Sequence, residues 1–181
     1  RGFSLIELMV VCGVFILLST VVLANNTRFG NIIVLQNLAH NIALSIREAQ
    51  VFGLASLQYG AQNFDTGYGV HITQGAGYEL FADVNGNGIY DSTEEVKPYT
   101  LGGGYTITDI CAPSITCGRS RLDILFKRPE PDACISAGES TPLDGDGDCI
   151  SSIQRAVVTL SSARGDTATI IVESTGQISV Q

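Results

Sequence analysis

One acidic stretch of the sequence has the residue types and spacing of a calcium-binding loop. It runs from Asp83 to Glu94 and fits the twelve-residue pattern in which oxygen-bearing residues recur at fixed places around a glycine, here Gly88. Calcium takes about six to eight oxygen ligands from carboxylates, amides and backbone carbonyls. The ligands that the pattern assigns are Asp83, Asn85, Asn87, the carbonyl of Ile89, Asp91 and Glu94.

The same loop has a second interpretation as a β-hairpin without metal. Strand-like sequence flanks it, which is wrong for an EF-hand, and two of its early ligands are neutral asparagines, which weaken cation binding. The pairs Asn85-Gly86 and Asn87-Gly88 are typical of hairpin turns, because both residue types tolerate left-handed backbone conformations. Both interpretations remain open for this segment.

A second acidic cluster fits the calcium pattern less well. Three carboxylates stand close together at Asp144, Asp146 and Asp148, but no glycine follows Asp148, and Arg155 occupies the twelfth place. A solvated loop is the simpler interpretation here, with calcium as the alternative.

Residues that commonly carry catalysis or bind nucleic acid are sparse. His40 and His71 have no partner at metal-ligand spacing, and the serines lack a nucleophile-elbow pattern. The glycines at 102–104 form no phosphate loop, because no Lys-Ser or Lys-Thr follows them. The net charge of -8 argues against nucleic-acid binding, which depends on lysine and arginine. We therefore expect no enzyme and no nucleic-acid partner.

Four of the five cysteines fall in two close pairs within sequence rich in glycine, proline and serine. One pair is Cys111 and Cys117, the other is Cys134 and Cys149, and Cys12 lies in an apolar run. Short loops bounded by cysteines are typical of disulfides, which need an oxidising compartment. Four cysteines allow three pairings, of which closeness in the sequence favours the local ones.

The elements that carry these residues begin with an apolar run over residues 3–24, in which Glu7 is the one charged residue. About 20 such residues span a bilayer as a helix. A secretory signal peptide is the rival interpretation, but its apolar region is shorter and ends in a small-residue cleavage site. We therefore expect a membrane-spanning helix.

The helical pattern continues beyond this run. Apolar residues recur at spacings of three and four, which indicates one helix face. Residues 1–97 contain no proline, so we expect one continuous helix from about Phe3 to about Phe52, with its second half packed on a globular domain. The residues of the face are Leu35, Leu38, Ala39, Ile42, Ile46, Ala49 and Phe52.

After about Gly60 the apolar period changes to two, which predicts strands separated by turns. The segment ARGD, residues 163–166, is typical of a hairpin turn. The segment from Pro129 to Ser152 has little apolar content, and we expect a long surface excursion there, held by Cys134 and Cys149. The expected strands are Tyr68–Thr73, Tyr78–Ala82, Val96–Leu101, Tyr105–Ile110, Leu122–Phe126, Ala156–Ser161, Thr167–Glu173 and Gln177–Val180.

The opening residues, RGFSLIELMV, resemble the processing site of type IV prepilins and type II secretion pseudopilins. The resemblance implies that a prepilin peptidase cuts between Gly2 and Phe3 and that Phe3 is then N-methylated. It also implies that Glu7, the family's acidic hallmark, pairs with the amino terminus of an adjacent subunit during assembly. The chain lacks an initiating methionine, so we expect a piece of a longer precursor.

The physical properties of this segment fit the resemblance. Arg1 favours the cytoplasmic side, and a cut after Gly2 keeps the helix and creates a positive amino group on Phe3. A carboxylate near the end of a membrane span costs several kcal/mol unless it is paired or solvated. Glu7 can reach the amino group of its own chain, one helical turn away, or that of a neighbour, and both remain open.

The order of later features is similar to that of H-type pseudopilins and FimT/FimU-type minor pilins. The similarity rests on the long helix, a strand carrying YGV at residues 68–70, the acidic loop, and a terminal hairpin ending in STGQISV. Many major pilins carry a helix-bending proline in the stretch that here reads VVLANN, which favours a minor subunit or pseudopilin. Some FimT-like proteins bind DNA through an arginine-rich last strand, but residues 176–180 have no basic side chain.

The fold class we expect is α+β, a long N-terminal helix packed on a C-terminal antiparallel β-sheet domain. Residues 1–2 would be the remnant of a leader, 3–24 the transmembrane and polymerisation helix, 25–55 its amphipathic continuation, and 60–181 a β-rich periplasmic domain.

The expected function is that of a non-catalytic filament subunit, a minor pilin or pseudopilin in a single-pass inner-membrane state before assembly. Its partners would be other pilin or pseudopilin subunits, the prepilin peptidase and the inner membrane. The alternative is a calcium-dependent adhesin or binding module that uses the helix as an anchor. The sequence does not separate a pilus from a secretion pseudopilus or a competence filament.

Overall fold

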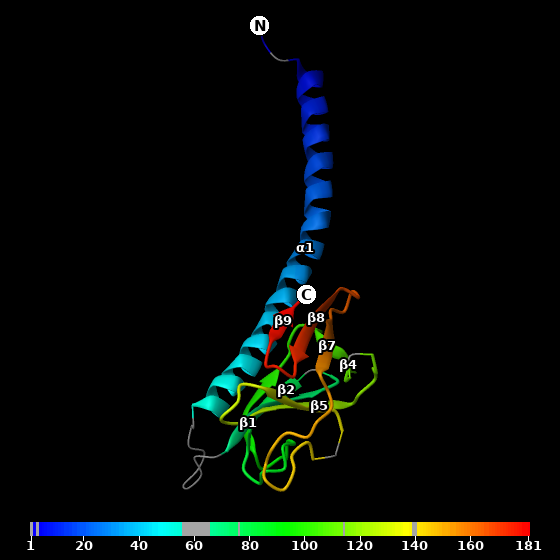
Figure 1. Cartoon of the computed structure of the whole chain (residues 1–181). Coiled ribbons are helices and arrows are strands. Elements are labelled where there is room, and N and C mark those ends of the chain that lie inside the picture. Colours follow the sequence, from blue (N-terminus) through cyan, green and yellow to red (C-terminus); the bar gives the residue numbers. More distant parts are fainter. Residues whose placement is uncertain (1, 3, 56–65, 76, 114, 139–140) are drawn as a thin grey trace. The chain divides into compact units, whose positions relative to one another are not determined.

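The computed structural model describes residues 2, 4–55, 66–75, 77–113, 115–138 and 141–181. Within these ranges the chain forms one helix, α1 (Leu5–Leu54), and nine strands in two antiparallel sheets (Figure 1). It divides into two compact units, residues 1–34 and 35–181. The strands are β1 (Gly67–Thr73), β2 (Gly77–Asp83), β3 (Glu95–Thr100), β4 (Thr106–Cys111), β5 (Arg121–Phe126), β6 (Ala133–Ser136), β7 (Arg155–Ser161), β8 (Thr167–Glu173) and β9 (Ile178–Val180).

The first unit holds the apolar part of α1. The segment Leu5–Leu23 has a mean hydropathy of 2.6, and none of it is buried. By length and composition it can cross a membrane, because about 20 apolar helical residues match the hydrocarbon thickness of a bilayer.

In the second unit, one face of α1 packs on the sheets. The expected face is confirmed, since its central side chains are at most 1% exposed and Leu38 and Phe52 pack against the same core. Near the end of the helix, a Cβ on Gly53 would lie 2.3 Å from the carbonyl oxygen of Phe126 in β5, so this close approach requires glycine. The central side chains are those of Leu35, Ala39, Ile42, Ile46 and Ala49.

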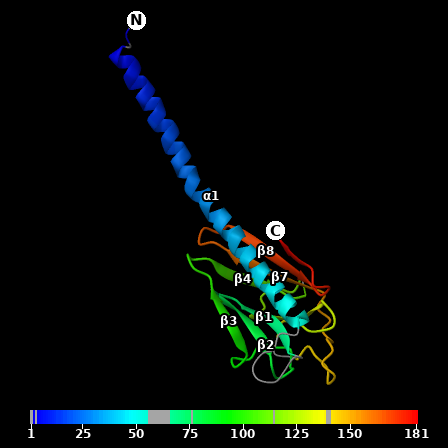
Figure 2. The ribbon, with the colours of Figure 1, turned by 90° about the vertical axis from the view of Figure 1, so that its left-hand side faces the viewer.

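The first sheet has the strand order β3-β2-β1-β5-β6, and the second has the order β4-β7-β8-β9. One main core contains residues of α1 and of both sheets, including Val70 and Ile72 of β1. Figure 2 shows strands of both sheets flanking the cyan part of α1. β9 lies beside this part of the helix, where Arg47 donates to the carbonyl of Ile178 at 3.3 Å (Figure 1).

A smaller second core lies on the other face of the first sheet, because successive side chains of a strand point to opposite faces. It contains Phe81, Leu125, Cys134 and Leu143, with Tyr90 packed against it. Tyr90 comes from the connection between β2 and β3, and Leu143 from the connection between β6 and β7. Two long loops therefore cover this face.

The expected fold class is confirmed, and all eight expected strands are present with ends that differ by at most one residue. The hairpin at ARGD is confirmed as well, since β7 and β8 pair across a turn in which the Ser162 N–H donates to the Asp166 carbonyl.

The expected surface excursion from Pro129 to Ser152 is wrong in part. Residues Ala133–Ser136 form β6, which pairs with β5, and all four are buried. The reason is that both faces of β6 are covered: Ala133 and Ile135 lie in the main core, and Cys134 lies in the second core. So short a strand, buried on both faces, lacks the alternation of apolar and polar residues that identified the others.

Candidate functional site

The candidate calcium loop connects two neighbouring antiparallel strands. Asp83 is the last residue of β2, and Glu94 directly precedes β3. Gly86 and Gly88 have φ angles of 74° and 77°, the left-handed conformation expected of them in a hairpin connection. The β-hairpin geometry is thus confirmed, and the same geometry gathers the six expected ligand positions into one loop.

The two acidic residues at the ends of the loop accept its backbone hydrogen bonds. The carboxylate of Asp83 accepts the N–H groups of Asn87 and Gly88 at 3.1 and 3.0 Å. The carboxylate of Glu94 accepts the N–H groups of Val84 and Asn85 at 2.9 and 3.1 Å. Asp83 and Glu94 are only 4% and 2% exposed, so both carboxylates lie inside the loop that they organise.

Burial raises the pKa of both carboxyl groups above their usual values, because desolvation penalises the charged form more than the backbone hydrogen bonds favour it. The stability linked to such a group is fully present below its unfolded pKa and is lost as the pH rises through the folded pKa. Negative charge on Asp83 and Glu94 therefore comes at a cost in stability. A cation in the loop would offset this cost.

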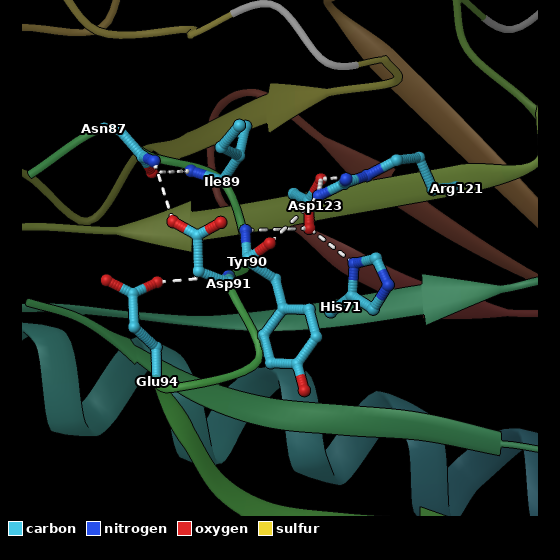
Figure 3. Close-up of polar contacts among 8 residues, drawn as sticks. All are labelled: His71, Asn87, Ile89, Tyr90, Asp91, Glu94, Arg121 and Asp123. Carbon is cyan, nitrogen blue, oxygen red and sulfur yellow. Dashed lines mark hydrogen bonds and ion pairs between the residues drawn. The ribbon is translucent and has the colours of Figure 1, made fainter. Parts of the chain in front are cut away.

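Three of the remaining ligand positions, Asn85, Asn87 and Asp91, contact one another in the middle of the loop. The side-chain oxygens of Asn85 and Asn87 accept the N–H groups of Asn87 and Ile89, both at 2.9 Å. The amide nitrogen of Asn85 donates to Oδ2 of Asp91 at 2.6 Å. That of Asn87 donates to the same oxygen at 3.0 Å (Figure 3). The donor set of carboxylate, amide and carbonyl oxygens is the set that calcium prefers. To take a cation, Asp91 would have to exchange its amide partners for the metal.

A buried carboxylate on β5 ties this loop to the sheet. Asp123 is 0% exposed and accepts hydrogen bonds from His71 Nδ1 at 2.6 Å and from Arg121 Nε and Nη2 at 3.1 and 2.8 Å (Figure 3). It also accepts the backbone N–H of Tyr90 at 3.3 Å, and Arg121 donates to the Tyr90 carbonyl at the same distance. The rings of His71 and Tyr90 stack with centroids 4.6 Å apart. The Asp123 cluster therefore fixes Tyr90, and with it one end of the loop.

Sequence reasoning missed this cluster, since it found no partner for His71 at metal-ligand spacing. Its members come from β1, the loop and β5, and only the pairing of β1 with β5 brings His71 opposite Asp123. One trace was available: Asp123 lies in the expected strand Leu122–Phe126 and Arg121 directly precedes that strand, so the two side chains share a face once the strand begins one residue earlier, as β5 does.

The expected processing and assembly residues lie in the first unit. Gly2 and Glu7 are exposed, and Phe3 lies outside the described residues. Ser4 directly precedes α1, and Glu7 follows three positions later, in the first turn. This is the spacing of a capping box, in which the glutamate reaches back to a free backbone N–H at the helix start. Glu7 thus has a local helix-stabilising role available besides the assembly role.

Both local cysteine pairs are disulfides. Cys111 is bonded to Cys117 and Cys134 to Cys149, which confirms the favoured pairing. Cys12 is free and exposed.

Calcium should raise the melting temperature of the chain in detergent relative to chelator. Binding to the native state alone stabilises by about 2.7 kcal/mol when free calcium is 100-fold above its Kd. Asp91→Asn should abolish this response without disturbing the backbone hydrogen bonds of Asp83 and Glu94, because Asp91 uses its carboxylate on side-chain amides.

The matched control is Asp146→Asn in the other acidic cluster, which should keep the full response. Circular dichroism measures the melting temperatures of the wild-type chain, Asp91→Asn and Asp146→Asn in calcium and in chelator. Equal melting temperatures for the wild-type chain in both buffers would leave a hairpin without a metal.

No family model, no curated protein and no solved structure matches the chain. What the structure has in common with a pilin-like architecture is its order of elements, an apolar N-terminal helix followed by a β-sheet domain.

Proposed function

We propose that this chain is a structural subunit of an extracytoplasmic filament, a minor pilin or pseudopilin that is anchored and polymerised through α1. The observation that carries the proposal is the segment Leu5–Leu23, which is apolar on all sides and unburied within its own unit. Apolar surface in water costs about 25 cal/mol per Å², so this segment needs lipid or other helices around it. A bilayer before assembly and a helical bundle after assembly supply these two environments in turn.

The residues in front of this segment support a helix that is retained. A cut between Gly2 and Phe3 precedes the apolar run, so processing would remove a leader and leave the anchor in place. A positive amino group would then lie one turn from Glu7, in reach of its own chain or of a neighbour. The two disulfides support an oxidising compartment for the β-sheet domain.

A calcium-dependent binding module, anchored by the same helix, is the second candidate function. It is favoured by the loop after Asp83, in which two buried carboxylates and two side-chain amides are gathered. Binding of a defined ligand without incorporation into filaments would favour this candidate over the filament subunit.

Processing gives the direct test of the filament proposal. In cells that contain a prepilin peptidase, Gly2→Trp should block cleavage, because a bulky side chain replaces the smallest residue at the cut. The uncut protein should stay in the membrane fraction and be missing from sheared filaments. Mass spectrometry of the N-terminus measures both the cut and the methylation of Phe3.

Gly2→Ala is the matched control and should still be cut, since it adds a single methyl group. Mature-sized protein with a free or methylated Phe3 from the Gly2→Trp variant would count against the filament proposal.

A further inference from the structure

The two loops that cover the outer face of the first sheet touch each other. One is the connection of residues 84–94, here called the β2–β3 loop. The other contains residues 141–149, here called the strap, which ends at Cys149. A Cβ on Gly88 of the β2–β3 loop would lie 2.8 Å from Cγ of Leu143 and 2.8 Å from Cγ of Pro142. The strap therefore lies directly against the backbone of the loop.

The contact is part of the second core. Leu143 is 6% exposed and belongs to the same cluster as Phe81 and Leu125. Gly88 has a positive φ and donates its N–H to Asp83 at 3.0 Å. Leu143 thus packs on Gly88, where the loop turns back toward Asp83.

The strap keeps Leu143 in place through Cys149. Leu143 and Cys149 form an antiparallel bridge, and between them the N–H of Asp144 donates to the carbonyl of Asp148 at 3.0 Å. Cys149 is bonded to Cys134, which lies in β6 and is paired with Leu125 of β5. The disulfide therefore bonds the sheet to Cys149, and the β-bridge connects Cys149 to Leu143, which packs on Gly88.

Besides the backbone hydrogen bonds that it donates to Asp83 and Glu94, the β2–β3 loop has two anchors of different kinds. At Tyr90 it is tied by hydrogen bonds to Asp123 and Arg121, which do not involve the strap. At Gly88 it is covered by Leu143, whose position depends on the disulfide. Loss of the disulfide should therefore loosen residues 84–89 before it loosens Tyr90.

We propose that the Cys134–Cys149 disulfide is a redox-sensitive latch that holds the β2–β3 loop closed. In the oxidised chain the strap holds Leu143 packed against Gly88. A dithiol reductant supplies two electrons and two protons: the sulfur–sulfur bond breaks, Cys134 and Cys149 become thiols, and the dithiol becomes a cyclic disulfide. The released strap then leaves Gly88, and the first half of the loop opens. The exposed position of Cys149 gives the reductant access to the bond.

Hydrogen exchange on the full chain in detergent tests the latch. Reduction with dithiothreitol, or Cys134→Ser with Cys149→Ser, should speed exchange in peptides covering residues 84–89 by at least about tenfold, as expected of a loss of local stability. Peptides of β7 and β8 should change little.

The chain offers a matched control in Cys111→Ser with Cys117→Ser. Each of the two disulfides joins a buried strand cysteine to an exposed one, but Cys111 belongs to β4 in the other sheet. The control should leave the exchange of residues 84–89 unchanged. An equal increase in the control variant would overturn the proposal, because it would show general loosening.

Leu143→Ala in the oxidised chain keeps the proposal testable if removal of the disulfide unfolds the whole domain. It removes the side chain that covers Gly88 and leaves the disulfide intact, so the local increase at residues 84–89 should appear in it as well. Unchanged exchange at residues 84–89 in Leu143→Ala would overturn the latch, whatever the cysteine variants do.

Discussion

Glu7→Gln should leave the chain inserted in the membrane, cleaved and folded, but missing from filaments. In a helical bundle from which water is largely excluded, a lone carboxylate is unfavourable, and the amino group of Phe3 on an adjacent subunit would compensate it. Removing one partner of a buried charge pair costs about 3–5 kcal/mol, because the other charge stays unpaired. Such a loss at every subunit contact would reduce incorporation below detection. Immunoblots of sheared filaments and of the membrane fraction measure it.

The design of this experiment depends on the local role of Glu7. Glutamine is also found at the third position of a capping box, so Glu7→Gln keeps the helix start and removes the charge. Ser4→Ala is the matched control, since it removes the capping hydroxyl at a cost of about 1 kcal/mol and keeps the charge. Ser4→Ala should assemble. The pairing would be contradicted if Glu7→Gln entered filaments as well as the wild-type chain, or if Ser4→Ala were lost from filaments to the same extent. Glu7 would then have only its role at the helix start.

Acetylation of the Phe3 amino group gives the complementary test of the same pair. Because the partner is a backbone terminus, no charge-swap variant exists. The acetylated chain should behave as Glu7→Gln does. Normal assembly after acetylation would contradict the pairing of Glu7 with the Phe3 amino group.

The helix and most of the strands could be predicted because their apolar periods follow directly from burial on one face. The face from Leu35 to Phe52 repeats every three or four residues, since one side of α1 meets both sheets. In β7 and β8 buried residues alternate with partly exposed ones, since one side of the second sheet faces the core. Such patterns can be recognised in the sequence without knowing which element packs on them.

Features that depend on pairing between distant segments could not be predicted in this way. β6 is buried on both faces, and its second face is buried only because the strap folds over it. His71, Tyr90 and Asp123 meet only after β1 has paired with β5 and the β2–β3 loop has folded back. The loop itself was recognisable from its spacing, but its anchoring to Asp123 and Leu143 was not.

Asp123→Asn should destabilise the domain more than any change to an exposed ion pair. The substitution keeps the shape of the side chain but removes the charge that His71 and Arg121 share in a site with 0% exposure. The expected loss is about 3–5 kcal/mol, a large part of the about 5–15 kcal/mol that a domain has. With a urea slope of about 1–3 kcal/mol/M, the unfolding midpoint should fall by about 2 M. Tyrosine fluorescence can follow the transition, because the chain has six tyrosines and no tryptophan.

The matched control is Glu173→Gln. Glu173 also accepts a short hydrogen bond from an arginine, Arg155, at 2.6 Å, but the two side chains are 25% and 50% exposed. Water and salt screen such a pair, so its loss should cost no more than about 1 kcal/mol. Similar costs for the two variants would mean that water reaches Asp123 in solution. Adding Arg121→Met to Asp123→Asn separates two causes of the lost stability. If the unpaired guanidinium dominates the loss, the double variant should regain part of the stability. If the lost hydrogen bonds of His71 and Tyr90 dominate, the double variant should regain none.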